Sequence, residues 1–208
     1  MNIVLIGIQG SGKGTLVTSL EKHLDLNVIS TGQLLRDEVA TGSSLGKHIK
    51  EIQMSGGLVE LDIVMDILKK KMKSNNKKIT VFDGFPRDME QAIALDKLSK
   101  PDIVIYLNLT KEVAVDRILS RLTCSKCGQI YNTKRINTLD CPNCGGKLEQ
   151  RFDDTIDSIN KRFEGFYKNT YPLIEKYKKD NVLFEVDASG TPDQVANTCL
   201  RIINEYNN

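Results

Sequence analysis

A glycine-rich loop near the N-terminus contains the residues of this sequence best suited to bind phosphate. Residues 7–15 read GIQGSGKGT and follow a short apolar run. Glycines let successive backbone N–H groups turn toward an anion, and the helix that follows adds the positive end of its dipole. Lys13 can bring a full charge to the β- and γ-phosphates of a nucleotide. Gly14 fills the last position of the general pattern G-x-x-x-x-G-K-S/T, and the hydroxyl moves to Thr15. We therefore expect another group to help hold a magnesium ion.

A second segment, ITVFDGFPR at residues 79–87, supplies an acid and an arginine that could complete this site. Asp83 ends an apolar run, and the carboxyl end of a buried strand is where α/β sheets bind ligands. We expect Asp83 to orient the water ligands of Mg²⁺. Arg87 follows a rigid Gly-Phe-Pro turn, so we expect its guanidinium to be held in a fixed direction. On its own, Asp83 would more simply cap a turn, but the phosphate loop favours the metal role.

Four cysteines form two C-x-x-C pairs separated by 13 residues: Cys124, Cys127, Cys141 and Cys144. Two such pairs with reduced thiols are typical of one Zn²⁺ held by four thiolates, while disulfides or a redox pair are the alternative. Four thiolates leave no open coordination position, so the metal is expected to be structural. The segment 123–148 is too short to bury a core, and the metal must supply its folding energy. The fifth cysteine, Cys199, is expected in the core.

The elements that must position these groups alternate between strand and helix. Apolar runs predict parallel strands at 3–6, 27–30, 79–82, 103–107 and 182–186. Helical patterns separate them at 13–24, 32–41, 45–54, 62–73, 89–98 and 111–121. Thr31 and Ser44 are the predicted caps of two of these helices. Pro172 predicts a kink or a break into two pieces in a helical segment at 155–179, and a final helix is expected from about 192 to 206. The alternation predicts the α/β class: three layers, with a five-stranded parallel sheet between helices.

Composition sets modest bounds on function. The 208 residues are 40% hydrophobic, which suits one α/β domain with a small insertion. A net charge of +2, from 29 basic and 27 acidic residues, leaves no strong electrostatic footprint for nucleic acid or membrane. The apolar runs are too short for a membrane span, and the N-terminal run has no basic leader. We expect a cytoplasmic protein with reduced thiols, no membrane partner and no nucleic-acid partner.

Together these motifs resemble those of the adenylate kinases, in the long-lid form that carries zinc. The resemblance covers nearly the whole chain and rests on the phosphate loop, STGQLLR at 30–36, DGFPR at 83–87, DRILSR at 116–121 and QRFDD at 150–154. It implies a P-loop core (1–29, 60–119 and 155–208), a small helical AMP-binding arm (30–59) and a lid with zinc knuckles (120–154). Gln9 is a departure, because the family usually has proline there. We expect this change to affect loop stiffness and not the chemistry.

The resemblance also implies the activity, which is the reversible, Mg²⁺-dependent reaction ATP + AMP = 2 ADP that balances the adenine nucleotides. It implies ATP-binding residues Gly10, Ser11, Gly12, Lys13, Gly14, Thr15, Arg117, Arg121, Ile130, Tyr131 and Gly190. The implied AMP-binding residues are Thr31, Arg36, Gly57, Leu58, Val59, Gly84, Phe85, Pro86, Arg87, Gln91, Arg151 and Arg162. The implied catalytic groups are Lys13, Asp83, Arg87, Arg121, Arg151 and Arg162, with Asp153 and Asp154 orienting the arginines.

The chemistry agrees with these implied roles. Arginine can grip a phosphate through two hydrogen bonds, and an amide such as that of Gln91 can read an adenine edge. No general base is expected, because the AMP phosphate, with a second pKa of about 6, is already a nucleophile at neutral pH. A closing arm and lid would exclude water and favour a monomer.

Two other functions stay open at this point. The first is another nucleoside monophosphate kinase, acting on UMP, CMP or GMP, because base choice depends on pocket shape. The second is a zinc-ribbon module that binds nucleic acid. That reading leaves the phosphate loop, Asp83 and the arginines unexplained, and the near-neutral charge gives it little support.

Overall fold

A parallel β-sheet lies at the centre of the computed structural model, which describes residues 1–73 and 77–207. Its strands are β1 (Asn2–Ile6), β2 (Leu26–Ser30), β3 (Ile79–Asp83), β4 (Ile103–Asn108) and β8 (Leu183–Asp187), in the spatial order β2-β3-β1-β4-β8. In the central strand Val4 pairs with Phe82 on one side and with Val104 on the other. Strands and helices alternate along the chain, so the expected α/β class with a five-stranded parallel sheet is confirmed.

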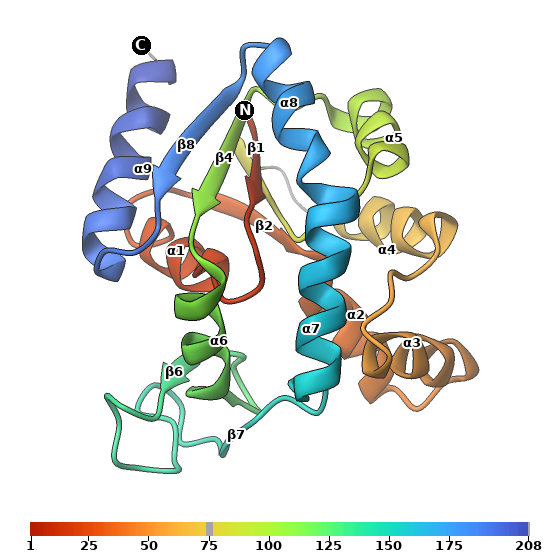
Figure 1. Cartoon of the computed structure of the whole chain (residues 1–208), viewed down its shortest axis with the longest axis vertical. Helices are drawn as coiled ribbons and strands as arrows, with labels where there is room; N and C mark the ends of the chain where they lie inside the picture. The colour runs from red at the N-terminus through yellow and green to blue at the C-terminus, as the bar shows by residue number, and fades with distance from the viewer. Residues whose placement is uncertain (74–76, 208) are drawn as a thin grey trace.

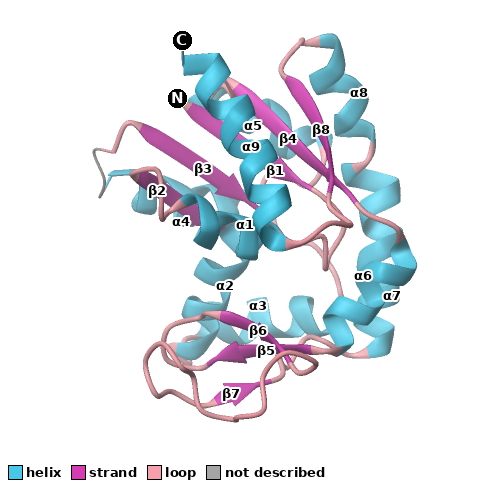
Figure 2. Ribbon diagram, turned by 90° about the vertical axis from the view of Figure 1, so that its left-hand side faces the viewer, coloured by secondary structure: helices cyan, strands magenta, loops and turns pink. Residues whose placement is uncertain are grey.

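Helices cover both faces of this sheet, which is why the central strands are apolar throughout. Helices α1 (Lys13–Leu20) and α9 (Pro192–Asn207) pack together on one face, and α5 (Met89–Ser99) and α8 (Pro172–Lys179) pack together on the other (Figures 1 and 2). Ile3, Val4 and the three residues from Ile103 to Ile105 are fully buried. Cys199 in α9 is also fully buried, as expected for a core residue.

Three helices that follow β2 form the arm and its return to the sheet: α2 (Thr31–Ala40), α3 (Ser44–Met54) and α4 (Leu61–Lys73). The predicted caps were wrong by one residue. Ser43 caps α3, and its hydroxyl accepts the Gly46 N–H at 2.9 Å, because the chain turns at Gly42 with φ of 72° and leaves Ser43 just outside the helix. Thr31 is already helical, and Ser30 before it makes no capping bond, since its hydroxyl donates to Asp83.

The lid, residues 120–154, contains a small antiparallel sheet that the sequence patterns did not predict. Helix α6 (Lys111–Leu119) leads into β5 (Arg121–Cys124), which pairs with β6 (Ile130–Asn132) and β7 (Leu148–Glu149). The predicted helix 111–121 ends earlier because Arg121 pairs with Asn132 in this sheet. Leu122 and Leu148 form a separate apolar cluster with Cys124 and Cys141.

The long helical segment is interrupted next to Pro172, as expected, but a π-helical turn divides it into three elements and not two. Helix α7 (Ile156–Gly165) continues through the π-helical turn η1 (Phe166–Thr170) into α8. Proline removes a backbone donor and crowds the preceding turn, and here the turn widens so that the Tyr171 N–H donates to the Phe166 carbonyl at 2.8 Å. In the part of the chain that the structure describes, no helix is both long and apolar enough to cross a bilayer.

Candidate functional site

A cavity of about 1720 Å³ opens at the carboxyl ends of β1, β2 and β3. The phosphate loop and Asp83 line it from the sheet side, and residues of the arm and the lid line it from the other side. Figure 2 shows α2, α3 and the lid strands facing this edge of the sheet. Every residue predicted to bind nucleotide lines the cavity except Phe85. The side chain of Phe85 is instead 1% exposed and belongs to the hydrophobic core, so the predicted role of Phe85 in an AMP site is left to its backbone.

The phosphate loop has the backbone that its glycines predict. Gly10 and Gly12 have φ angles of 85° and 95°, values that residues other than glycine rarely adopt. A Cβ on Gly10 would lie 2.6 Å from the carbonyl oxygen of Ala114, so the loop also packs closely against α6. The shape of the loop therefore depends on glycine at both positions.

Lys13 at the start of α1 folds its ammonium back over this loop. Its Nζ donates to the carbonyl of Gly7 at 2.7 Å, to that of Ile8 at 3.3 Å and to the Ser11 hydroxyl at 3.4 Å. Burial lowers the pKa of Lys13 to about 8, and the nearby Asp83 carboxylate opposes this shift. The ammonium therefore lies desolvated at the phosphate loop, where an anion would stabilise it.

Asp83 ends β3 directly opposite Ser30, the last residue of β2. The Ser30 hydroxyl donates to Oδ2 of Asp83 at 3.1 Å. Carboxylate and hydroxyl oxygens, with waters completing the shell, are the ligands that Mg²⁺ prefers. Since both Asp83 and the loop hydroxyl of Thr15 line the cavity, the donor set fits a magnesium ion carried by a nucleotide.

Arg36 and Arg87 both line the cavity. The Arg87 Nε donates to the Gly84 carbonyl at 2.9 Å, and its own carbonyl accepts the Thr170 hydroxyl at 2.6 Å. Arg36 on α2 donates to the side chain of Gln33 at 2.9 Å. Burial lowers the pKa of both arginines, and their positive neighbours add to this effect. Cations crowded in this way favour a bound anion.

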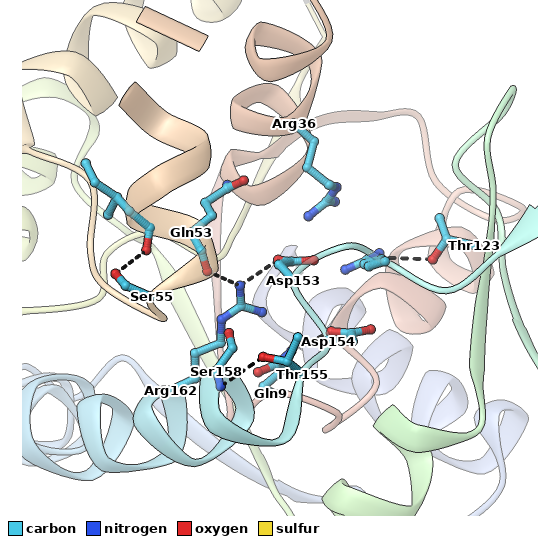
Figure 3. Close-up of polar contacts among 12 residues, drawn as sticks. Gln9, Arg36, Gln53, Ser55, Thr123, Asp153, Asp154, Thr155, Ser158 and Arg162 are labelled. Atoms are coloured by element: carbon cyan, nitrogen blue, oxygen red, sulfur yellow. Dashed lines mark hydrogen bonds and ion pairs between the residues drawn. The ribbon is translucent and has the colours of Figure 1, made fainter. Parts of the chain in front are cut away.

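Two further arginines form ion pairs with consecutive aspartates at the end of the lid. Arg121 lies against Asp154 with Nη2–Oδ1 and Nη2–Oδ2 distances of 2.6 and 2.7 Å. Arg162 lies 2.6 Å from Asp153, and it also donates to the main-chain carbonyl of Gln53 in the arm at 3.3 Å (Figure 3). The predicted partnership of both aspartates with arginines is present. The contact with Gln53 had no signal in the sequence, because it involves only a backbone oxygen.

The last two arginines of the predicted set also line the cavity. Arg151 donates from Nε to the Thr123 hydroxyl at 3.1 Å, and burial lowers its pKa. Arg117 donates to the carbonyl of Ser189 at 3.4 Å, next to Gly190. The predicted residues therefore converge from α1, α2, β3, α6, the lid and α7 on one cavity.

Gln91 is buried, with 4% of its surface exposed, and its side chain already has a partner. Its Oε1 accepts the backbone N–H of Arg87 at 2.8 Å, and its own N–H is capped by Asp88. The amide oxygen is thus engaged in positioning Arg87. The side-chain NH₂ is the part of Gln91 left to contact a ligand in the cavity that it lines.

The four predicted metal ligands converge in the lid. The Sγ atoms of Cys124, Cys127, Cys141 and Cys144 all lie within 4.8 Å of one another. Two of the separations, Cys124–Cys144 and Cys127–Cys141, are 3.5 and 3.7 Å. A tetrahedron with Zn–S bonds of about 2.3 Å has edges of about 3.8 Å, so the group fits one thiophilic metal ion.

Comparisons with known proteins agree with this geometry. The family model described as adenylate kinase matches residues 5–182. A protein named adenylate kinase from Thermosipho melanesiensis is 40% identical, with 98% of this chain and 99% of that protein covered. Adenylate kinases from Thermosipho africanus and Archaeoglobus fulgidus are 41% and 38% identical, covering 98% and 93% of this chain and 99% and 92% of their own lengths.

Proposed function

The chain belongs to the adenylate kinase family, and we propose on this premise that it transfers a phosphoryl group reversibly from ATP to AMP, giving two ADP. The observation that supports this most directly is the single cavity, in which a glycine loop and Lys13 face several arginines from separate segments. Phosphoryl transfer requires positioning and charge stabilisation more than covalent chemistry, and a ring of cations suits that need.

We propose the following division of roles. The loop N–H groups and Lys13 bind the ATP phosphates, and Arg36 and Arg87 bind the phosphate of AMP. Arg121, Arg151 and Arg162 stabilise the negative charge on the phosphoryl group as it moves. The AMP phosphate itself attacks, because with a second pKa of about 6 it is a dianion at neutral pH.

We propose that Asp83, with Ser30 orienting it, holds the water ligands of a Mg²⁺ ion that enters with the nucleotide. A magnesium ion there would neutralise phosphate charge and orient the terminal phosphates. In the lid, we propose that the four cysteines hold a structural Zn²⁺. The ion would connect the two knuckles, because the apolar cluster of the lid is too small to stabilise the fold alone.

We also propose that the arm (30–59) and the lid (120–154) close over bound substrates on a core made of the remaining residues. Closure excludes water, which would otherwise accept the phosphoryl group. The enzyme would act in the cytoplasm as a monomer, without membrane or nucleic-acid partners.

The test is a coupled assay that supplies ATP and Mg²⁺ with AMP, UMP, CMP or GMP as the acceptor. We expect rapid ADP formation with AMP and at least about tenfold lower kcat/KM with the other three. A preference for another monophosphate would reassign the base specificity. Absence of transfer to all four, in a protein that melts cooperatively, would refute the proposal.

A further inference from the structure

Gln9 in the phosphate loop contacts the lid across 145 residues of sequence. Its side-chain Nε2 donates to Oδ1 of Asp154 at 3.2 Å. Figure 3 shows the two residues where the lid returns to α7. This is the position at which the chain departs from the proline typical of the resembling sequences. A proline has no amide side chain and could not make this bond.

Asp154 is the same carboxylate that pairs with Arg121. Its side chain is 6% exposed, and both of its oxygens accept bonds from the guanidinium. Gln9 therefore supplies a further donor to a buried anion. When Arg121 turns toward a phosphate, Asp154 loses part of its compensation, and a buried carboxylate without donors is strongly unfavourable. The amide of Gln9 keeps one donor in place.

In the described part of the chain, the carbonyl oxygen of the Gln9 amide makes no hydrogen bond that would compete with the contact to Asp154. Oε1 of Gln9 is buried and has no hydrogen-bond partner among the described residues. The side chain also lines the nucleotide cavity, so it is not buried in the hydrophobic core. Among the described residues, the bond to Asp154 is the one hydrogen bond that orients the amide.

We propose that Gln9 is a positioning residue that fastens the lid to the phosphate loop through Asp154 and so sets Arg121 beside the phosphates. The inference rests on the proposed function. Losing the contact shifts the lid toward its open form, and a lower population of the binding-competent form weakens apparent ATP affinity in proportion. Release of the product is not slowed, so kcat is preserved or rises.

The experiment compares steady-state kinetics of the wild type with Gln9→Met, Gln9→Glu, Asp154→Ala and the Gln9→Met/Asp154→Ala double variant. Gln9→Met keeps the length of the side chain and removes the donor. We expect it to raise KM for ATP about fivefold, with KM for AMP and kcat within about twofold of wild type or kcat higher. Gln9→Glu sets a like charge against Asp154 and should raise KM for ATP further. Thermal melting checks that each variant is folded.

The double-mutant cycle separates this role from a purely structural one. In the Asp154→Ala background no side-chain acceptor is left for the Gln9 amide, and Gln9→Met should then change KM for ATP by less than about twofold. The control is Gln129→Met, the same substitution at a lid residue outside those that line the cavity, which should leave the kinetics unchanged. An unchanged KM in Gln9→Met, or an equal rise with and without Asp154, would overturn the inference. A wild type unable to make ADP would instead refute the proposed function.

Discussion

Arg162 and Asp153 form a buried ion pair in which the Nη2 and Oδ2 atoms are 2.6 Å apart. Only 18% of the arginine side chain and 4% of the aspartate side chain are exposed. Burial alone would raise the pKa of Asp153, but the charge and hydrogen bond of Arg162 outweigh it and hold the pKa below its ordinary value. Because Arg162 also contacts the Gln53 carbonyl, the pair joins the lid and α7 to the arm.

Asp153→Asn should destabilise the protein at neutral pH by about 3 kcal/mol, because it leaves a buried arginine without its anion. A carboxyl whose pKa is lower in the folded chain stabilises the fold above its unfolded pKa of about 4. That contribution disappears as the pH falls through the lower, folded value. The difference between variant and wild type should therefore shrink from pH 7 to pH 3. Urea unfolding at both pH values measures it.

The matched control for this prediction is Asp116→Asn, which breaks an ion pair with Lys134 whose two side chains are 58% and 61% exposed. Exposed pairs contribute little, so this variant should unfold almost as the wild type does at both pH values. A destabilisation in Asp153→Asn that is equally large at pH 7 and pH 3 would contradict the assigned pKa direction.

Lys13→Met should lower catalytic activity strongly without loss of stability. The pKa of Lys13 is lowered to about 8 by burial, which means that the fold disfavours the charged ammonium. Methionine removes that charge at similar volume, so the free energy of unfolding at pH 7 should be unchanged or higher. The loss of a phosphate-binding cation should lower kcat/KM by about 100-fold or more. Urea unfolding and the coupled assay give the two readouts. Turnover close to that of the wild type would contradict the assignment of Lys13 to a phosphate-binding site.

Gln91→Glu should weaken AMP binding while leaving Arg87 in place. Glutamate keeps an oxygen that can accept the Arg87 backbone N–H, but at neutral pH it has no NH₂ to donate. We expect KM for AMP to rise about tenfold with KM for ATP unchanged. Gln91→Leu removes both groups and should lower kcat as well. Equal kinetic constants for AMP in wild type and Gln91→Glu would exclude the amide from base recognition.

The sequence predicted the core much better than the lid, and the reason is physical. Strands such as β1 and β4 are buried on both faces, so continuous apolar runs mark them within a residue or so. Strand β7 has two residues, and β5 and β6 pack on a cluster that includes Cys124 and Cys141, so no apolar run marks them. Side-chain pairs over long separations, such as Gln9 with Asp154, have no local pattern at all.

The same limit applies to the candidate site. Motifs located its cations and its four cysteines, because spacing determines which residues share a loop or a turn. They did not show that the Phe85 side chain lies in the core, or that the side-chain carbonyl of Gln91 accepts the backbone N–H of Arg87. Such details depend on how the turn after β3 packs against α5 and η1, which only the folded chain determines.

Removing the metal from the lid should lower thermal stability more than it lowers the rate of transfer. The four Sγ atoms are close enough to share one ion, and a cluster of so few apolar residues cannot hold the lid sheet together alone. With a strong chelator we expect Tm to fall by about 5 °C or more, while single-turnover transfer at 25 °C falls less than about tenfold. Cys127→Ser should lose bound zinc, and Cys199→Ser, which changes a thiol buried in the core, should retain it. Metal analysis of both variants and melting curves with and without chelator test this, and superimposable curves would count against a structural metal.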